Sequence, residues 1–507
     1  MASPKEKLAG SLEALSVLQK RGIVAIRPSD LTRTHRERLV KNGFLQKVMK
    51  GWYIRSRADE ARGESTAWYT SFWDFCAAYL NVRFGDAWSL SPEQSLRVHT
   101  GNRSVPRQLL VRAPKARNKM TNLAHDTSLF ESRDASIPPH DQTKVVDGLR
   151  LFALPAALVA VGPRFFVQNA TDARTALAMV RDASDVLSVL LEGGHSTVAG
   201  RLAGAFRNIG RGRIADEIVE TMRSADYDVR ARDPFEEQTA DIVAVREPSP
   251  YVFRMRLMWE SMRNTLSRSF PKAPGLPNDP AAYLKAVDEI YIDDAYHSLS
   301  MEGYRVSPAL IERVRGAAWN PDENVEDGDE LDAMAAKGYH EAFLAVKESV
   351  RRILSGENPG TVADEDHAAW YRQLFAPSVT AGILRPSDLA GYRNDQVYIR
   401  HSRYVPPRRE AVRDLMPALF DLLKDESEPA VRVVLGHFMF VYIHPYMDGN
   451  GRMGRFLMNV MLASGGYPWT VVPTERRDEY MEALEAASTQ SNIRPFAELL
   501  AGLIRSS

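Results

Sequence analysis

The sequence predicts a mainly α-helical protein with a smaller β-containing part in its N-terminal half. Three observations support this fold class. Stretches of the C-terminal half, such as 251–270 and 431–443, repeat apolar residues at helical spacing. Residues 170–225 are rich in alanine and show the same spacing. Short strand-like runs, such as 108–112 and 148–152, lie between turn-rich segments before residue 165.

Length and composition limit the class of protein. At 507 residues, with 44% apolar and 26% charged residues and zero net charge, the chain is long enough for about three domains. No window approaches 18 uninterrupted apolar residues, and the start lacks a hydrophobic signal core. The single cysteine, Cys76, cannot form an internal disulfide. We therefore expect a cytoplasmic protein with no membrane partner.

The first 57 residues are basic, with 13 Lys or Arg against 4 acidic residues. Helical spacing over 8–19, a short helix from Ser29 and a second helix over 34–41 are followed by a hairpin over 44–54, broken at Lys50-Gly51. Three short helices and a hairpin are the order of a winged helix-turn-helix, predicted for residues 1–60.

DNA is one partner that this basic segment predicts. The second helix would enter the major groove and the hairpin would lie near phosphate, with Arg33, Arg36, Lys47 and Lys50 as contacts. The alternative is a wing that binds protein. The pattern, including the run NGFLQKVMKGWYI, resembles the winged helix of AbiEi-type antitoxins over roughly residues 10–230. That resemblance implies an α+β domain over 61–230 and a role in a toxin-antitoxin system.

A polar, proline-flanked stretch at 231–250 predicts a linker. Beyond it, residues 251–507 predict an all-α domain with helices over 251–270, 279–300, 329–353 and 364–375 and through most of the remainder. Residues 391–407 contain a period-two segment and end in two prolines, which predicts a hairpin with an exposed edge.

Residues 444–455, called the motif below, read His-Pro-Tyr-Met-Asp-Gly-Asn-Gly-Arg-Met-Gly-Arg. Apolar runs on both sides place the motif in a loop between two helices. A turn ahead of a helix offers free backbone N–H groups and the positive end of the helix dipole, where anions bind. Gly449 and Gly451 let the backbone approach a phosphate, and Asn450 adds a side-chain amide.

The charged side chains of the motif suit chemistry on a nucleotide phosphate. Asp448 is a hard oxygen ligand for Mg²⁺. Arg452 and Arg455 are three residues apart, so both can project toward one anion. His444 is the only group of the cluster that can accept a proton near pH 7. His437, two helical turns upstream, is expected to be structural.

The motif resembles the signature of the Fic family, HPFx[D/E]GNGRxxR, at every defined position except Tyr446, which replaces phenylalanine. The resemblance extends over roughly residues 280–500 and implies an all-α Fic core over 340–500 with a β-hairpin flap. Fic proteins are mostly adenylyltransferases. The edge of the flap, at Gln396, Val397, Tyr398 and Ile399, would then dock the target as an added strand.

The matching positions imply specific roles. His444 would accept the proton of a target Tyr, Thr or Ser hydroxyl that attacks the α-phosphate of ATP. Asp448 would hold Mg²⁺, and the Gly-Asn-Gly turn would cradle the phosphates. Arg455 would bind the γ-phosphate, with Arg452 supporting the cradle. Related kinases of the Doc type carry Ala and Lys where this chain has Gly449 and Gly451, so the glycines favour transfer of AMP over transfer of phosphate.

Ser298 and Glu302 match the inhibitory pattern [S/T]xxxE[G/N] of the same family. Glu302 can form a bidentate ion pair with Arg455 and occupy the γ-phosphate position, while Ser298, one turn earlier, steadies the pair. In family members with this arrangement the same glutamate also supports removal of AMP, so transfer and removal are both implied here.

The leading hypothesis is an auto-inhibited protein adenylyltransferase with an N-terminal DNA-binding module. Three alternatives stay open: a DNA-binding regulator or antitoxin whose C-terminal half senses nucleotide, a protein-interaction module, and an enzyme that transfers another nucleotide or phosphate. The sequence leaves the target and the oligomeric state undecided, and a homodimer is compatible with it.

Overall fold

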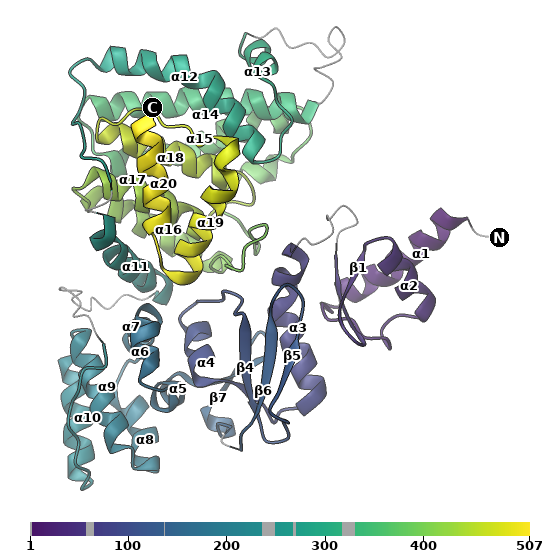
Figure 1. Ribbon diagram of the computed structural model, residues 1–507, viewed down its shortest axis with the longest axis vertical. Helices are drawn as coiled ribbons and strands as arrows, with labels where there is room; N and C mark the ends of the chain where they lie inside the picture. Colours follow the sequence, from purple (N-terminus) through teal and green to yellow (C-terminus); the bar gives the residue numbers. More distant parts are fainter. Residues whose placement is uncertain are drawn as a thin grey trace. The chain divides into compact units, whose positions relative to one another are not determined.

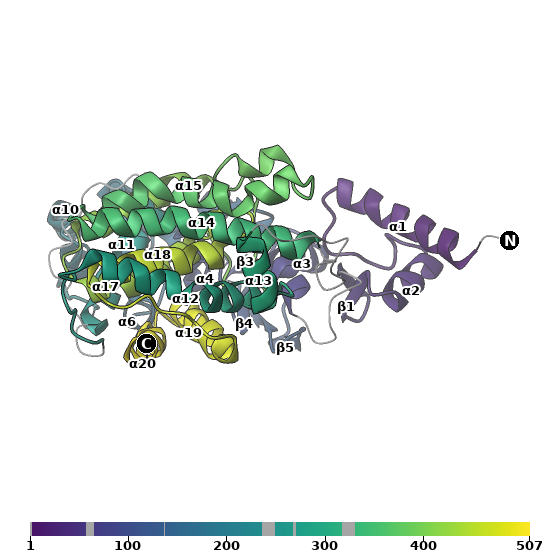
Figure 2. The same ribbon diagram turned by 90° about the horizontal axis from the view of Figure 1, so that it is seen from above.

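The computed structural model describes residues 3–56, 65–135, 137–235, 249–266, 270–316 and 330–506. They form two compact units. Unit 1 comprises Met1–Pro250 together with the short segment Tyr398–Val405, and unit 2 comprises Tyr251–Val397 and Pro406–Ser507. The predicted mainly α-helical class is confirmed (Figures 1 and 2). Most of the expected linker, residues 236–248, lies outside the described residues.

Unit 1 begins with two helices and a hairpin, which are α1 (Pro4–Lys20), α2 (Arg33–Lys41), β1 (Leu45–Met49) and β2 (Trp52–Arg55). Ser3 and Thr32 cap the two helices through their side-chain oxygens. The helix expected at Ser29 is wrong. That stretch is a turn, because Asp30 accepts a hydrogen bond from the Arg27 backbone N–H at 2.7 Å and α2 starts too soon for another helix to fit.

An α+β part follows. It contains a four-stranded sheet with the strand order β3-β4-β6-β5, whose bounds are given below. β4 and β6 are parallel, and the other pairings are antiparallel. The elements are α3 (Thr66–Phe84), β3 (Ser89–Leu90), α4 (Pro92–His99), β4 (Gln108–Ala113), β5 (Lys119–Asn122), β6 (Ser128–Arg133), β7 (Thr143–Val146) and β8 (Leu149–Phe152). Buried aromatic residues of α3 pack with the inward residues of the sheet, and Cys76 is buried among them.

The rest of unit 1 is a helical bundle. Its helices are α5 (Leu154–Ala160), α6 (Arg164–Gln168), α7 (Ala170–Met179), α8 (Ala183–Gly193), α9 (Ser196–Asn208) and α10 (Gly212–Ser224). The alanine-rich composition allows close approach in this core. At Gly204 a Cβ atom would lie 2.2 Å from the Arg232 backbone, so the strand-like tail after α10 can pass directly over α9 only because the side chain is absent.

In the described residues of unit 2, helices joined by loops are the only regular secondary structure. Its helices are α11 (Pro250–Leu266), α12 (Pro280–Met301), α13 (Pro308–Arg315), α14 (Glu330–Leu354), α15 (Pro359–Thr380), α16 (Arg409–Asp425), α17 (Pro429–Ile443), α18 (Asn450–Ser464), α19 (Arg477–Gln490) and α20 (Arg494–Ser506). α14 and α15 run side by side (Figures 1 and 2), and α17 packs on α18. No helix within the described ranges is long and apolar enough to span a bilayer.

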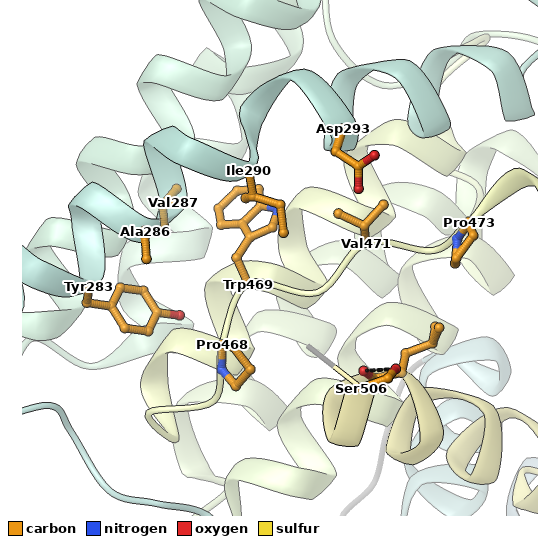
Figure 3. A pocket seen from close by; sticks show the side chains of 11 residues that line it. Tyr283, Ala286, Val287, Ile290, Asp293, Pro468, Trp469, Val471, Pro473 and Ser506 are labelled. Carbon is orange, nitrogen blue, oxygen red and sulfur yellow. Dashed lines mark hydrogen bonds between the residues drawn. The ribbon is translucent and has the colours of Figure 1, made fainter. Parts of the chain in front are cut away.

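A cavity of about 420 Å³ opens between α12, the segment after α18, and α20. Figure 3 shows Ile290 and Asp293 from α12 facing Trp469 and Pro473 of that segment, with Ser506 below. None of the motif residues lines this cavity, so it is separate from the phosphate-binding loop that the sequence predicts.

Replacing Gly204 by alanine should destabilise unit 1 by roughly 1–3 kcal/mol, because the new methyl group meets backbone atoms that cannot turn away. Gly212→Ala is the matched control, since no atom lies within 4 Å of its Cβ position, and its effect should stay within about 0.5 kcal/mol. Urea unfolding monitored by hydrogen exchange in α9 and α10 measures both. Equal effects would mean that the tail does not pack on α9.

Candidate active site

Residues 444–449 of the motif form the turn between α17 and α18, and residues 450–455 form the start of α18. Both ends of the turn adopt left-handed backbone conformations. His444 ends α17 with φ 54°, and Gly449 precedes α18 with φ 79°. At Gly449 a Cβ atom would also lie 2.8 Å from the Phe375 ring. A glycine is therefore required there on two grounds, conformation and space. The turn delivers the first N–H groups of α18, which have no partner within the helix.

Tyr446 anchors the turn in the core. Its ring is 1% exposed and stacks on Tyr371 with ring centres 3.8 Å apart. The side-chain amide of Asn450 closes the turn, because its oxygen accepts from the Tyr446 N–H and its nitrogen donates to the Tyr446 carbonyl, each at 2.9 Å. The sequence assigns this amide to a phosphate. In the structure its hydrogen-bonding capacity is used to hold the loop.

His444 is oriented by the end of its own helix. Its Nδ1 lies 3.2 Å from the Val441 carbonyl, so Nδ1 carries the proton and Nε2 remains a base. Burial lowers the pKa of His444 to about 4, with a smaller contribution from the positive charge of Arg393. The imidazole is thus neutral at neutral pH, as a general base must be.

Arg393 supports the motif from the segment before α16, and no sequence pattern pointed to it. Its Nε donates to the His444 carbonyl at 2.8 Å, and its backbone N–H donates to the Pro445 carbonyl at 2.9 Å. The same guanidinium donates to the carbonyls of Asp395 and Pro407. One fully buried arginine therefore ties the loop 394–407 to the turn that follows α17. A lone arginine in a polar loop carries no signal of this in sequence.

Arg455 is buried, with 4% of its surface exposed, and its three guanidinium nitrogens contact α12 or Glu302, the residue that follows it. Nη1 lies 3.4 Å from Met301 Sδ. Nε donates to Ser298 Oγ at 2.9 Å and Nη2 donates to the Ser298 carbonyl at 3.1 Å. Nη2 also donates to Glu302 Oε1 at 2.6 Å. The predicted bidentate ion pair between Arg455 and Glu302 is wrong. Glu302 accepts a hydrogen bond only from Nη2, because Nε donates to Ser298.

The side chain of Glu302, which follows α12, lies against the first turn of α18. A Cβ atom at Gly451 would be only 2.2 Å from Glu302 Oε1, so the carboxylate sits where the glycine leaves the backbone open. Burial alone would raise the pKa of Glu302, but the charges of Arg455 and Arg452 outweigh it and lower the pKa. The carboxylate is thus ionised and occupies the anion position at the start of the helix.

Arg452 does not share the Glu302 carboxylate with Arg455 through a hydrogen bond, although the sequence suggested that both arginines project toward one anion. Its side chain lies between two aromatic rings and beside Asp448. Its guanidinium carbon lies 5.1 Å from the Tyr304 ring centre and 4.9 Å from that of Phe375, and Nη2 lies 3.2 Å from Asp448 Oδ2. The two rings hold this 1% exposed arginine in place. Asp448 itself is 67% exposed at the rim of the site.

A second layer supports α12 behind Ser298. Asp294 is 4% exposed and accepts a hydrogen bond from the Tyr339 hydroxyl at 2.7 Å. Burial raises the pKa of Asp294 to about 6, and the Tyr339 hydrogen bond opposes that rise. His437 is structural, as expected, because its two ring nitrogens contact the Gly454 carbonyl and the Tyr480 hydroxyl, each at 2.7 Å.

The predicted flap is not a hairpin. No strand pairing occurs over 391–407, where side chains instead take the backbone groups that a ladder would use. The Gln396 amide donates to the carbonyls of Val397 and Pro406, and prolines at 406 and 407 lack N–H donors. Val397 is buried, while Tyr398 is exposed and Ile399 half-buried.

The four basic residues predicted to contact DNA differ in their surroundings. Lys47 and Lys50 on the hairpin are exposed. Arg33 is exposed and pairs with Glu37 at 2.7 Å. Arg36 is half-buried, donates to the Pro28 carbonyl at 3.2 Å and lies over the Tyr53 ring. Three of the four side chains thus remain available to solvent, and Arg36 serves the internal packing of the first helices.

The region that contains the motif matches a known protein family. Residues 364–462 match the Fic/DOC family, so the C-terminal region contains a Fic/DOC domain. The chain is 27% identical over 258 residues to a protein adenylyltransferase Fic of Nematostella vectensis, covering 49% of this chain and 55% of the relative. It is 29% identical over 227 residues to one of Drosophila willistoni, covering 44% and 41%. The chain spans about half the length of the curated relatives it matches.

Among solved structures, a part of Fic-1 from C. elegans aligns with a TM-score of 0.37 at 19% identity, covering 67% of this chain and 94% of that one.

Ser298→Ala should destabilise unit 2 by about 1–3 kcal/mol, because it removes the Oγ acceptor and leaves the buried Arg455 Nε without a partner. The matched control is Ser300→Ala in the same helix, since its side chain is half-buried and the helix propensity gain is identical. Chemical denaturation of both variants tests this, and an equally small effect for both would show that Ser298 does not hold Arg455.

Proposed function

We propose that this protein transfers AMP from ATP to a hydroxyl side chain of a target protein. The observation that carries the proposal is an anion position at the start of α18, flanked by Gly451 and Arg455 and adjacent to the neutral imidazole of His444. The match of residues 364–462 to the Fic/DOC family and the adenylyltransferase relatives agree with it.

In the proposed reaction, the target hydroxyl oxygen forms a bond to the α-phosphorus of ATP. The bond from that phosphorus to the bridging oxygen breaks, and pyrophosphate leaves with the electron pair. His444 Nε2 accepts the hydroxyl proton, and the fixed Nδ1 donor keeps that nitrogen available. The N–H groups of α18 and Arg455 offset the negative charge that accumulates on the phosphates.

Asp448 is the residue that would hold Mg²⁺. Its exposed carboxylate at the rim fits an ion shared with substrate phosphates. Among the residues that the structure describes, no three His, Cys, Asp or Glu side chains cluster to hold a metal by themselves. Bound there, the ion would neutralise phosphate charge. Arg452, fixed between two rings, would keep Asp448 in place.

Glu302 would hold the enzyme in an inhibited state. Its carboxylate and a γ-phosphate would compete for Arg455 and for the space above Gly451, and two anions cannot share that position. The negative charge of the same carboxylate acts on the imidazole of His444 and partly opposes the lowering of its pKa. It could therefore orient water for removal of AMP, with His444 returning a proton to the departing hydroxyl.

The basic hairpin supports a second activity, DNA binding by residues 1–60. Lys47 and Lys50 project from β1 and the turn after it into solvent, as phosphate contacts would. In this proposal the N-terminal module directs the transferase to DNA or represses its own operon. In the alternative, the protein is a DNA-binding regulator or antitoxin whose C-terminal half senses nucleotide. It would bind DNA through the same hairpin and nucleotide at the same position at the start of α18.

Glu302→Gly should increase labelling of the protein itself or of lysate proteins by α-labelled ATP and Mg²⁺, because it frees Arg455 for the γ-phosphate. Adding His444→Ala should lower the rate about 10²–10⁴-fold through loss of the base. Glu302→Gln, which keeps the size but not the charge, should give an intermediate gain. Transfer of nucleotide is ruled out if Glu302→Gly incorporates no label from any nucleotide.

Full-length protein should bind a random-sequence DNA duplex with strong salt dependence. The double change Lys47→Glu and Lys50→Glu should weaken binding and reduce the slope of log K against log salt by about two, one unit for each lost phosphate contact. Lys115→Glu with Lys119→Glu is the control, because both are exposed in unit 1 outside the first hairpin. Equal losses in both doubles, or binding that ignores salt, would argue against a DNA site on the hairpin.

A further inference from the structure

The cavity between α12, the segment 467–474 that follows α18, and the last turn of α20 has no part in the proposed function. Its volume of about 420 Å³ lies in the range of pockets that hold small molecules. All of its walls belong to unit 2, and neither Ser298 nor Glu302 lines it. The chemistry of the walls therefore indicates what a second site in this unit would bind.

Two polar contacts hold the cavity open. The Tyr283 hydroxyl donates to the Tyr467 carbonyl at 2.7 Å, and the Thr474 N–H donates to His297 Nδ1 at 3.1 Å. Tyr283 and His297 are fourteen residues apart on α12, or about 21 Å along the helix axis. The segment is thus fixed to α12 at both ends, and two prolines between them restrict its backbone. The cavity is therefore preformed.

Most of the lining is apolar. Figure 3 shows the rings of Tyr283 and Trp469 toward one end of the cavity, with Asp293 toward the other. Aliphatic side chains from all three walls complete the surface, which are Val287, Ile290, Val471 and Leu503. Such walls favour a ligand with an apolar body that contains a ring, and the faces of aromatic rings also attract cations.

The charge in the lining is negative. Asp293 is the one charged side chain among the described residues that line the cavity, and its side chain is 64% exposed, so it lies at the mouth. His297 Nε2 lies 3.5 Å from Asp293 Oδ1. Because His297 Nδ1 accepts from Thr474, Nε2 carries the proton and faces the carboxylate. The mouth of the cavity therefore suits a cation.

The end of α20 adds to this preference. Its last turn lines the cavity at Ser506, and carbonyl groups at the C-terminus of a helix carry partial negative charge. The nearest arginine to this turn is Arg476, with Nη1 3.9 Å from the position of a Cβ atom at Gly502. Its guanidinium donates two hydrogen bonds to Glu479, at 2.8 and 2.7 Å, so its charge is paired.

The cavity and the active site use different faces of α12. Val287, Ile290 and Asp293, spaced three residues apart, line the cavity. Asp294 and Ser298, four residues apart, are buried on the side that holds Arg455. A ligand in the cavity would therefore contact α12 without meeting Arg455.

We propose that this cavity binds a small amine, with an apolar, ring-containing body between α12 and the segment 467–474 and its ammonium group beside the Asp293 carboxylate. The ligand would contact both walls only while α12 occupies its present position, so binding stabilises that position. The site does not depend on the proposed function. In combination with that function, the ligand would favour the state in which Glu302 pairs with Arg455.

Three probes that share one body test the chemistry: 4-phenylbutylamine, 4-phenylbutanol and 4-phenylbutanoate. Titration of the full-length protein, followed by NMR, should give the amine a dissociation constant of about 1 mM, about threefold below that of the alcohol, with the carboxylate weakest. Asp293→Asn should make the amine and the alcohol bind alike. Glu289→Gln, which removes an exposed charge of α12 outside the lining, should keep the preference. Equal binding of all three probes, or an amine preference that survives Asp293→Asn, would overturn the proposal.

Filling the cavity tests the location. Ala286→Phe should weaken binding of the amine about tenfold, because the new ring occupies the space of the ligand. Ala286 is exposed at the cavity, and Ala282→Phe, at an exposed position of α12 outside the lining, is the control. Val471→Phe fills the cavity from the opposite wall, so a folding defect in one variant leaves the other. Unchanged affinity in a folded filling variant would place the amine elsewhere and refute the site.

Hydrogen exchange measures the effect on α12 without any nucleotide. At twice its dissociation constant, the amine should slow amide exchange over 294–302 about threefold, because opening of α12 would release it. Bound amine with unchanged exchange would contradict the stabilisation of α12. Since no step uses ATP, failure of nucleotide transfer would leave these three measurements and their interpretation intact.

Discussion

The hydrogen-bonded ion pair between Arg455 and Glu302 is the interaction on which the site depends. Arg455 is buried, so its charge needs a partner, and removal of that partner from a buried cation is costly. In this structure the partner is a carboxylate of α12. In the proposed function, a phosphate of the bound nucleotide would offer the same charge at the same place. The arginine would then couple the position of α12 to the occupancy of the helix N-terminus.

The turn around this pair is constrained by space and by backbone conformation. Gly449 has a left-handed backbone and abuts the Phe375 ring, and Gly451 has a carboxylate oxygen where a side chain would begin. Asn450 closes the turn on Tyr446, which stacks on Tyr371 in the core. The residues of the motif thus divide into those that shape the loop and those that face an anion, a division that their order in sequence does not reveal.

Much of the fold was predictable because helical periodicity reports which face of a segment is buried. The helices around the motif were expected from their apolar spacing, and Asp279 caps α12 at the position where the sequence predicted that this helix begins. Local signals failed where side chains compete for backbone groups. The expected helix near Ser29 is a turn, and the expected hairpin over 391–407 has no ladder. In both, polar side chains satisfy the backbone without regular structure.

The sequence by itself determined that a histidine, an acid, a Gly-Asn-Gly turn and two arginines would lie close together, since twelve consecutive residues cannot lie far apart. It also suggested Glu302 as the partner of Arg455, through a short pattern. Only the tertiary structure decided how the charges are shared. Arg452 turns to Asp448 between Tyr304 and Phe375, Arg393 supports His444 from a distant loop, and Val405 is buried in the N-terminal unit. Apart from the Arg452–Asp448 pair, these contacts join residues tens to hundreds of positions apart, and packing rather than periodicity selects them.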